Sequence, residues 1–209
     1  MRQLVLGISP SAEPTFEGFV TGRNDELVAR LREIAAGNRS ETVVYLWGER
    51  GSGRSHLLGA TSRGATDPSR LTIADDVDTL DEAGQIALFN RINEIRAAAH
   101  AGGGGTLLAA GPVPPGQLAL RDDLKSRLAW GLVYQVRTLT DTEKAQYLRD
   151  EAQRRGLRIG DEVVAYLLTH VRRDLPSLVA ILSHLDEFSL SRQRPLTLPL
   201  VREALAALA

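Results

Sequence analysis

The first two thirds of the chain alternate between short continuous apolar runs and stretches with apolar residues three to four positions apart. The continuous runs predict four strands, at residues 42–47, 71–74, 106–110 and 132–136. The helical spacing predicts one helix after Asn24, whose side chain can cap it, and a long helix after Asp81. The residues expected to face inward from these two helices are Leu27, Leu31, Ile34, Ala35, Leu88, Phe89, Ile92, Ile95 and Ala99.

The last third of the chain contains helical spacing only. Thr140 and Glu143 form a capping box that opens a helix ending at Gly156. Further helices are predicted at 161–171, at 174–190 and from Pro199. Strands alternating with helices, followed by helices alone, predict an α/β base with a parallel sheet and a small all-helical lid. We expect a flexible tail at 1–15, the base at 16–137 and the lid at 138–209.

A glycine-rich segment, Gly48–Ser55, follows the first predicted strand and leads into a helix-compatible stretch. It reads G-x-x-x-x-G-R-S, a phosphate-binding P-loop with Arg54 where lysine is expected. Its glycines let backbone N–H groups turn around a phosphate, and the helix N-terminus favours the anion. Arginine clamps oxygens as a planar fork but fits poorly around a transferring phosphoryl group, so we predict nucleotide binding with slow turnover. The alternative is a glycine-rich turn between strand and helix.

Two acidic residues follow the second predicted strand, and this pattern has the form of a Walker B strand. A carboxylate beside the P-loop strand can hold Mg²⁺, with a P-loop hydroxyl as a further ligand. The candidate metal ligands are Ser55, Asp75 and Asp76. The alternative is that the two acids only end a strand and open a turn.

The amino-acid composition argues against several classes of function. The 209 residues include 25 basic and 26 acidic side chains, a net charge of −1, which does not favour a whole-surface grip on nucleic acid or membrane. The absence of cysteine excludes disulfides, thiolate nucleophiles and cysteine–zinc sites, and the four histidines lack metal-ligand spacing. The first apolar run is too short for a signal peptide, and no run approaches the roughly 20 residues of a membrane span. We therefore expect a soluble, cytoplasmic protein.

These segments together resemble the AAA+ ATPases, most closely the DnaA-related branch and the Hda family within it. Residues 19–24 (F-V-T-G-R-N) resemble the segment on the adenine side of the nucleotide site, and the arginine-containing P-loop resembles that of Hda. Residues 124–131 (L-K-S-R-L-A-W-G) resemble the segment that bears the arginine finger, which implies this role for Arg127. Residues 172–175 resemble the sensor 2 motif, which implies nucleotide contact by Arg173.

The resemblance implies an adaptor that regulates the initiation of DNA replication. Bound to ADP or ATP, it would dock on the DNA-loaded sliding clamp and stimulate hydrolysis of ATP held by the initiator DnaA, with weak or no ATPase activity of its own. DNA would be contacted mainly indirectly, no membrane is involved, and self-association is compatible with the family. The implied nucleotide contacts are Val20, Asn24, Arg50, Gly51, Ser52, Gly53, Arg54, Ser55, His56 and Arg173. The implied clamp contacts, in a tail that resembles the Hda clamp-binding peptide, are Gln3, Leu4, Leu6 and Ile8.

The alternative function is a self-sufficient AAA+ ATPase, such as an initiator-like or helicase-loader motor. Arg127 could also be an ordinary surface arginine, and the tail a fragment of edge strand. The chain departs from the family in three places: residues 57–71 leave no room for a usual extra strand, residues 111–115 lack the polar sensor 1 side chain, and the clamp motif continues as Gly7-Ile8. The second departure makes intrinsic hydrolysis less expected.

Overall fold

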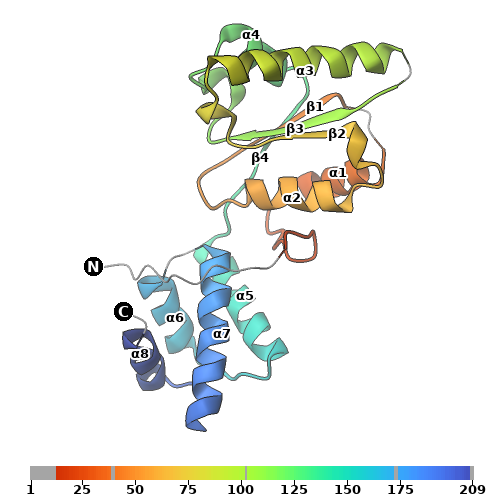
Figure 1. Cartoon of the computed structure of the whole chain (residues 1–209). Coiled ribbons are helices and arrows are strands. Elements are labelled where there is room, and N and C mark those ends of the chain that lie inside the picture. The colour runs from red at the N-terminus through yellow and green to blue at the C-terminus, as the bar shows by residue number, and fades with distance from the viewer. Residues whose placement is uncertain (1–12, 39–40, 102, 172–173, 208–209) are drawn as a thin grey trace. The chain divides into compact units, whose positions relative to one another are not determined.

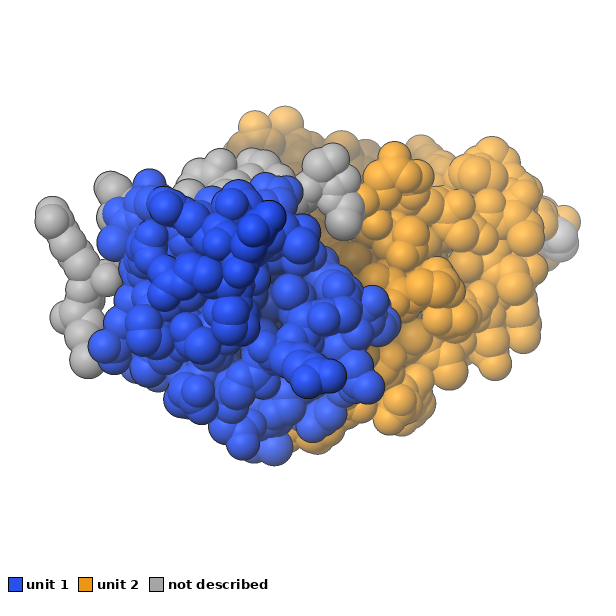
Figure 2. Space-filling view, turned by 90° about the horizontal axis from the view of Figure 1, so that it is seen from below, with its two compact units in different colours: residues 1–12, 139–209 blue, residues 13–138 orange. Residues whose placement is uncertain are grey.

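The structure, a computed structural model, describes residues 13–38, 41–101, 103–171 and 174–207. These residues form two compact units, Glu13–Thr138 and the described part of the chain from Leu139 onward, which Figure 2 distinguishes by colour. Each unit has hydrophobic clusters of its own.

The first unit is built on four parallel strands. They are β1 (Val43–Trp47), β2 (Leu71–Ala74), β3 (Thr106–Gly111) and β4 (Leu132–Gln135). Their order in the sheet is β2-β3-β1-β4, so β1, which leads into the P-loop, lies between β3 and β4. This arrangement confirms the predicted parallel-sheet α/β base.

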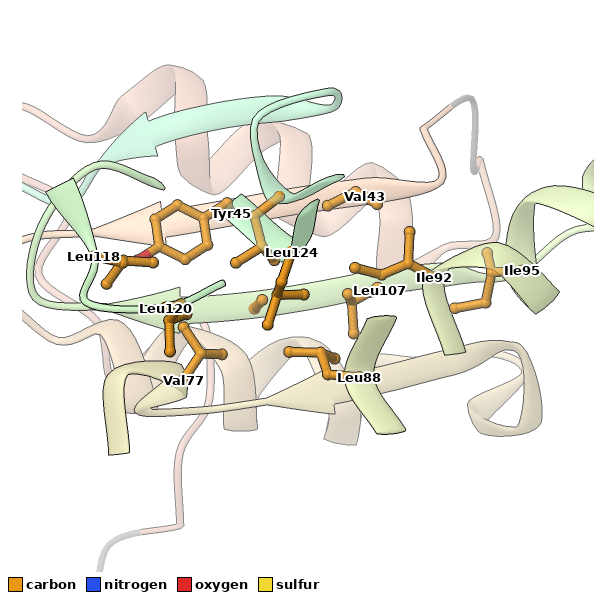
Figure 3. Close-up of a cluster of buried hydrophobic side chains, with 12 residues drawn as sticks. Val43, Tyr45, Val77, Leu88, Ile92, Ile95, Leu107, Leu118, Leu120 and Leu124 are labelled. Atoms are coloured by element: carbon orange, nitrogen blue, oxygen red, sulfur yellow. The ribbon is translucent and has the colours of Figure 1, made fainter. Parts of the chain in front are cut away.

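Helices cover both faces of this sheet (Figure 1). One face carries α1 (Asp25–Ala35) and α2 (Arg54–Gly64), and the other carries α3 (Glu82–His100) and α4 (Asp122–Leu128). Successive side chains of a strand point to opposite faces. Val44 and Leu46 of β1 therefore pack with α1 and α2, whereas Val43 and Tyr45 pack with α3 and α4, as Figure 3 shows.

Three short 3-10 turns lie between the predicted elements. They are η1 (Pro68–Arg70), η2 (Val77–Thr79) and η3 (Pro115–Gln117). In the described segment that joins α2 to β2, η1 is the only regular element, and no strand forms there. The short 57–71 segment thus holds no extra strand, as predicted, and β2 is an edge of the sheet.

The second unit is all helical, as predicted for the lid. It contains α5 (Asp141–Arg154), α6 (Asp161–His170), α7 (Leu175–Arg192) and α8 (Leu198–Ala206). The capping box of α5 is confirmed, because Thr140 Oγ1 accepts from the Glu143 N–H at 3.2 Å and Glu143 Oε2 accepts from the Thr140 N–H at 2.6 Å. The four helices share one buried cluster, whose members include Leu148, Val163, Leu167, Leu178, Ile181 and Val201. Within the described ranges, no helix is both long and apolar enough to span a bilayer.

Two local predictions were wrong. Asn24 occupies the N-cap position of α1, but its side chain makes no cap hydrogen bond and is used elsewhere. Ala99 is exposed rather than inward-facing, because α3 has 19 residues, a length of about 28 Å that exceeds the strands it covers. The predicted start of α3 after Asp81 is confirmed, and Asp81 caps the helix, since its Oδ1 accepts from the Gly84 N–H at 2.8 Å.

Candidate nucleotide-binding site

The Gly48–Ser55 loop lies at the carboxyl edge of the sheet, between β1 and α2. Gly51 and Gly53 have φ angles of 82° and 98°, in the left-handed region that glycine adopts readily. Gly48 is required for space, since a Cβ there would lie 2.4 Å from the Val136 carbonyl oxygen. The first backbone N–H groups of α2 have no partner within the helix and are available to a ligand of the loop. The predicted order of strand, glycine loop and helix is confirmed.

Two polar atoms of the loop are buried and have no hydrogen-bond partner: Ser52 Oγ and Arg54 Nη1. The Arg54 side chain is only 12% exposed. A buried polar group without a partner costs about 1–3 kcal/mol, and more when it is charged. An anion in the loop would satisfy the guanidinium and could accept from the hydroxyl. The residues present therefore fit a phosphate group.

The second terminal nitrogen of Arg54 faces the acidic end of β2. Arg54 Nη2 lies 3.7 Å from Asp76 Oδ1, and Asp75 Oδ1 accepts from the Asp76 N–H at 2.9 Å. Asp76 has a φ of 44°, an uncommon conformation for a residue other than glycine. The structure thus brings the P-loop arginine and the Walker B acids together.

Magnesium ions are usually held by one or two carboxylates together with phosphate oxygens and water. Asp75 and Asp76 are exposed and could supply the carboxylates, and Ser55 is exposed in the first turn of α2. No group of three or more potential side-chain ligands of the His, Cys, Asp or Glu type occurs in the part of the chain that the structure describes. The residues present fit a Mg²⁺ ion that is also bound by the phosphate oxygens of a nucleotide. They do not form a site that would hold the ion without the nucleotide.

Tyr45 of β1 fills the space beside the end of β3, where the polar sensor 1 side chain is missing. Its hydroxyl donates to the Val113 carbonyl oxygen at 2.9 Å, and a Cβ on Gly111 would lie 2.2 Å from the same hydroxyl oxygen. Burial raises the pKa of Tyr45 above its ordinary value, so the hydroxyl stays protonated. This proton is committed to Val113 and is not available to orient a water molecule.

Residues 13–20 pack against the P-loop and α2. A Cβ on Gly53 would lie 2.6 Å from the Phe19 ring, so the aromatic side chain closes over the loop. His56 Nε2 lies 2.7 Å from the Thr15 carbonyl oxygen, and its ring centroid is 5.8 Å from that of Phe19. The structure therefore places His56 against this segment. Of the other predicted contacts, Val20 is half-buried and Arg50 is exposed.

Asn24 joins the start of α1 to the chain after β4. It is only 3% exposed. Its Nδ2 donates to the carbonyl oxygens of Thr21 and Arg137 at 2.9 and 3.0 Å, and its Oδ1 accepts from the Arg137 N–H at 2.8 Å. These three bonds engage both ends of the side chain and direct its Oδ1 to Arg137, which explains why it does not cap α1.

A polar pocket of about 250 Å³ opens beside this junction. Its lining residues are Arg23, Glu49, Gln135, Val136, Arg137 and Thr138. Arg23 Nη2 donates to the Thr138 carbonyl oxygen at 3.3 Å, which holds one wall to the other. The pocket lies between residues 19–24 and the beginning of the P-loop, since Arg23 and Glu49 both line it.

Arg127 lies in the last turn of α4, near the amino ends of the strands, whereas the P-loop follows the carboxyl end of β1. The chain then enters β4 beside the start of β1, where a Cβ on Gly131 would lie 1.8 Å from the Val43 carbonyl oxygen. The Arg127 guanidinium carbon is 3.7 Å from the Trp130 ring centroid and 5.3 Å from that of Phe89. Gln3, Leu4, Leu6, Ile8 and Arg173, the remaining predicted contacts, lie outside the described residues.

Comparison with known proteins identifies the family. Residues 141–205 match the family described as Hda, lid domain. Over 98% of its length the chain is 32% identical to an uncharacterised protein of Haemophilus influenzae, of which 98% is also covered. The fold is similar to domain III of the replication initiation protein DnaA from Thermotoga maritima, with a TM-score of 0.74 at 17% identity over 96% of this chain and 99% of that one. The chain belongs to the Hda-like, DnaA-related branch of the AAA+ proteins.

The architecture of this Hda-like protein extends to more distant AAA+ proteins. The RuvB Holliday junction branch migration motor of Thermotoga maritima has a TM-score of 0.57 at 12% identity, over 93% of this chain and 72% of that one. This likeness concerns the fold alone. The family assignment confirms the resemblance that the P-loop, the adenine-side segment and the lid motifs had indicated.

Several site residues of the Hda-like chain were missed by sequence reasoning. Tyr45 was assigned only to a strand, Arg137 only to a domain boundary, and Phe19 only to a family motif. Their roles depend on contacts between segments far apart in the chain, such as that between Asn24 and Arg137. Trp130, the aromatic residue within the 124–131 segment, was visible in the sequence, but the sequence alone showed no contact that gave it a role.

Proposed function

We propose that this DnaA-related replication regulator is an adaptor that carries adenine nucleotide in its own P-loop and activates ATP hydrolysis on a partner. Docked on the DNA-loaded sliding clamp through residues 3–8, it would offer Arg127 to ATP held by the initiator DnaA. The product would be the ADP form of DnaA. An arginine finger supplied to another subunit is worth about 10³–10⁵ in rate in related phosphoryl-transfer systems.

The position of Arg127 relative to the P-loop carries this proposal. The P-loop follows the carboxyl end of β1, whereas the Arg127 end of α4 lies near Val43, at the amino end of the same strand. The four steps from Val43 to Trp47 correspond to roughly 13 Å of strand. A guanidinium at the amino end of the strand is far from the nucleotide site of its own chain, which suits a group that acts on a neighbour.

The chain's own nucleotide is proposed to be a structural ligand. Arg54 and Ser52 would hold its phosphates, and Phe19, Val20 and Asn24 would support the base side. Mg²⁺, where bound, would neutralise phosphate charge with help from Ser55, Asp75 and Asp76. Slow intrinsic hydrolysis is expected, because Arg54 replaces lysine and Tyr45 occupies the sensor 1 region. Arg173 remains a predicted contact from the lid.

The decisive experiment measures ATP hydrolysis by DnaA with clamp-loaded DNA, in the presence of wild-type protein or variants at equal concentration. Arg127→Ala should lose most of the stimulation while keeping the fold and bound nucleotide. Arg127→Lys should rescue poorly, because one ammonium cannot reproduce the planar fork of donors. Arg121→Ala is the matched control, since Arg121 also belongs to the α4 region but is paired with Asp123. Full stimulation by Arg127→Ala would reduce this residue to a surface charge and overturn the proposal.

A further inference from the structure

Two guanidinium groups lie against a single exposed indole at the end of α4. The ring of Trp130 is approached by the guanidinium carbons of Arg127 and Arg96, at 3.7 Å and 4.1 Å from its centroid. Trp130 is 52% exposed. We call Arg96, Trp130 and Arg127 the Arg–Trp–Arg cluster. Arg96 comes from α3 and Arg127 from α4, so the indole joins the two helices at the surface.

The backbone around Trp130 is fixed on both sides. Its N–H donates to the Arg127 carbonyl oxygen at 3.3 Å, which extends the end of α4. The next residue, Gly131, lies so close to β1 that any side chain there would overlap the Val43 carbonyl. The backbone that carries this exposed tryptophan is therefore held in place, and the two arginines lie against its ring.

Stacking occupies the flat face of a guanidinium and leaves its edge free. The five N–H donors of arginine lie in the plane of the group and point outward from a stacked arrangement. Among the residues that the structure describes, neither Arg96 nor Arg127 forms an ion pair or a side-chain hydrogen bond. Many other arginines of this unit, including Arg91 and Arg121, are paired with carboxylates. The cluster therefore presents two cations with unused donors side by side.

Phosphate oxygens are the ligands that such donors recognise best. A nucleic-acid base is less suited to this surface, because it would stack on the indole, where Arg127 already lies at 3.7 Å. We propose that Trp130 is a positioning residue that holds the Arg127 guanidinium ready for a phosphate group of a nucleotide bound by a partner subunit. Arg96 is the second cation of the same surface. This inference rests on the proposed function of Arg127 and adds two residues to it.

The test uses the full chain with DnaA, clamp-loaded DNA and ATP. Trp130→Ala should lower the maximal stimulation of hydrolysis about tenfold, because an arginine that has lost its ring is no longer held in place. The protein concentration that gives half-maximal stimulation should stay unchanged, and Trp130→Phe should recover part of the loss. Trp130→Ala should add nothing in an Arg127→Ala background. Arg96→Ala should raise the half-maximal concentration about threefold, whereas the control Arg91→Ala should not.

A merely structural tryptophan would give a different pattern. In that case Trp130→Ala would lower the melting temperature of the protein. It would also change both the maximal stimulation of hydrolysis and the protein concentration that gives half of it. This pattern would overturn the inference. Full stimulation by Trp130→Ala, with Arg127→Ala inactive, would overturn the inference and leave the proposed function standing. Full stimulation by Arg127→Ala would instead remove the proposed function itself.

Fluorescence gives an independent measurement. In a Trp47→Phe background Trp130 is the only indole, since the chain has two tryptophans. Its emission should change on addition of ATP-loaded DnaA with clamp-loaded DNA, and the change should require Arg127. A saturable change with oligodeoxythymidylate alone would identify a nucleic-acid surface and contradict the inference.

Discussion

At the scale of single residues, the P-loop contains two buried polar atoms that have no hydrogen-bond partner. Ser52 Oγ and Arg54 Nη1 are buried without partners, and Arg54 has only a distant contact with Asp76. Such groups are costly in the free protein and become favourable when an anion arrives. The affinity for nucleotide is therefore coupled to the stability of the protein.

The first prediction concerns Arg54. Saturating ADP, at about 100 times its dissociation constant, should stabilise the wild type by about 2.7 kcal/mol and raise its melting temperature by roughly 5–10 °C. Arg54→Ala should abolish most of this shift without lowering the melting temperature of the free protein, because it removes a buried cation whose Nη1 has no partner and whose Nη2 has only the 3.7 Å contact with Asp76. Thermal melting with and without ADP measures both effects. Arg63→Ala, at the exposed far end of α2, is the control and should keep the shift. An unchanged wild-type curve at millimolar ADP would contradict a nucleotide site.

The second prediction concerns Asn24. Asn24→Ala removes three hydrogen bonds and leaves the N–H and C=O of Arg137 without their partner. The free energy of unfolding should fall by about 2–3 kcal/mol. Chemical denaturation measures this loss, with the exposed Asn90→Ala as a control that should change little. Equal stabilities of the two variants would show that water replaces the lost bonds.

At the scale of elements, the strands and most of the helices that the structure describes follow the pattern of apolar residues. Continuous apolar runs became strands, which are buried in β1 and β3 and half-exposed in β2 and β4. Capping residues such as Asp81 and Thr140 marked helix starts, because these signals are local. The 3-10 turns are too short to show periodicity. Contacts between distant elements, such as Tyr45 with Val113 and Phe19 with Gly53, have no local signal and needed the structure.

The third prediction concerns the contact between β1 and β3. Gly111→Ala should destabilise the protein by about 1–3 kcal/mol, because the new methyl group would lie 2.2 Å from the Tyr45 hydroxyl oxygen. Tyr45→Phe removes this oxygen, so the double variant should be less destabilised than the sum of the two single changes. A double-mutant cycle by denaturant unfolding measures the coupling. Additive losses would mean that the clash is relieved by backbone movement instead.

At the scale of the whole molecule, the chain forms two units with separate hydrophobic clusters, and the residues of the proposed function are distributed unevenly between them. The P-loop, the Walker B acids and Arg127 all belong to the first unit, whereas the family match covers the second. A separate cluster in each unit suggests that each one can fold without the other.

The fourth prediction follows from the cluster of the second unit. A fragment of residues 139–209 should be helical and melt cooperatively, which circular dichroism measures. Leu167→Ala should remove the cooperative transition, because truncating a fully buried leucine costs about 2–5 kcal/mol in a small domain. Leu190→Ala, at a position that is 71% exposed, should not. A fragment that melts without a transition would mean that the helices depend on the first unit.

The fifth prediction concerns residues 3–8 of the tail, which lie outside the described residues. Replacing Gln3 and Leu4 with alanine should abolish capture by an immobilised sliding clamp and leave the melting curve and its ADP shift intact. Replacing Ser9 and Ser11 with alanine is the control in the same tail and should keep capture. Unfolding of the first double variant would identify the segment as a core strand and not as a partner-binding peptide.

The position of β2 at the end of the sheet order has a consequence for handling the protein. Its four residues are hydrogen-bonded to β3 on one side, Ile73 is 38% exposed, and Arg91 Nε donates to Thr72 Oγ1 at 3.1 Å. Unpaired backbone groups of an edge strand can join to any extended chain that is nearby. During synthesis or refolding at high concentration, β2 can pair with an extended segment of another copy before α3 packs against the sheet. The strand has only four residues and Arg91 binds Thr72, and both features keep the risk of aggregation small.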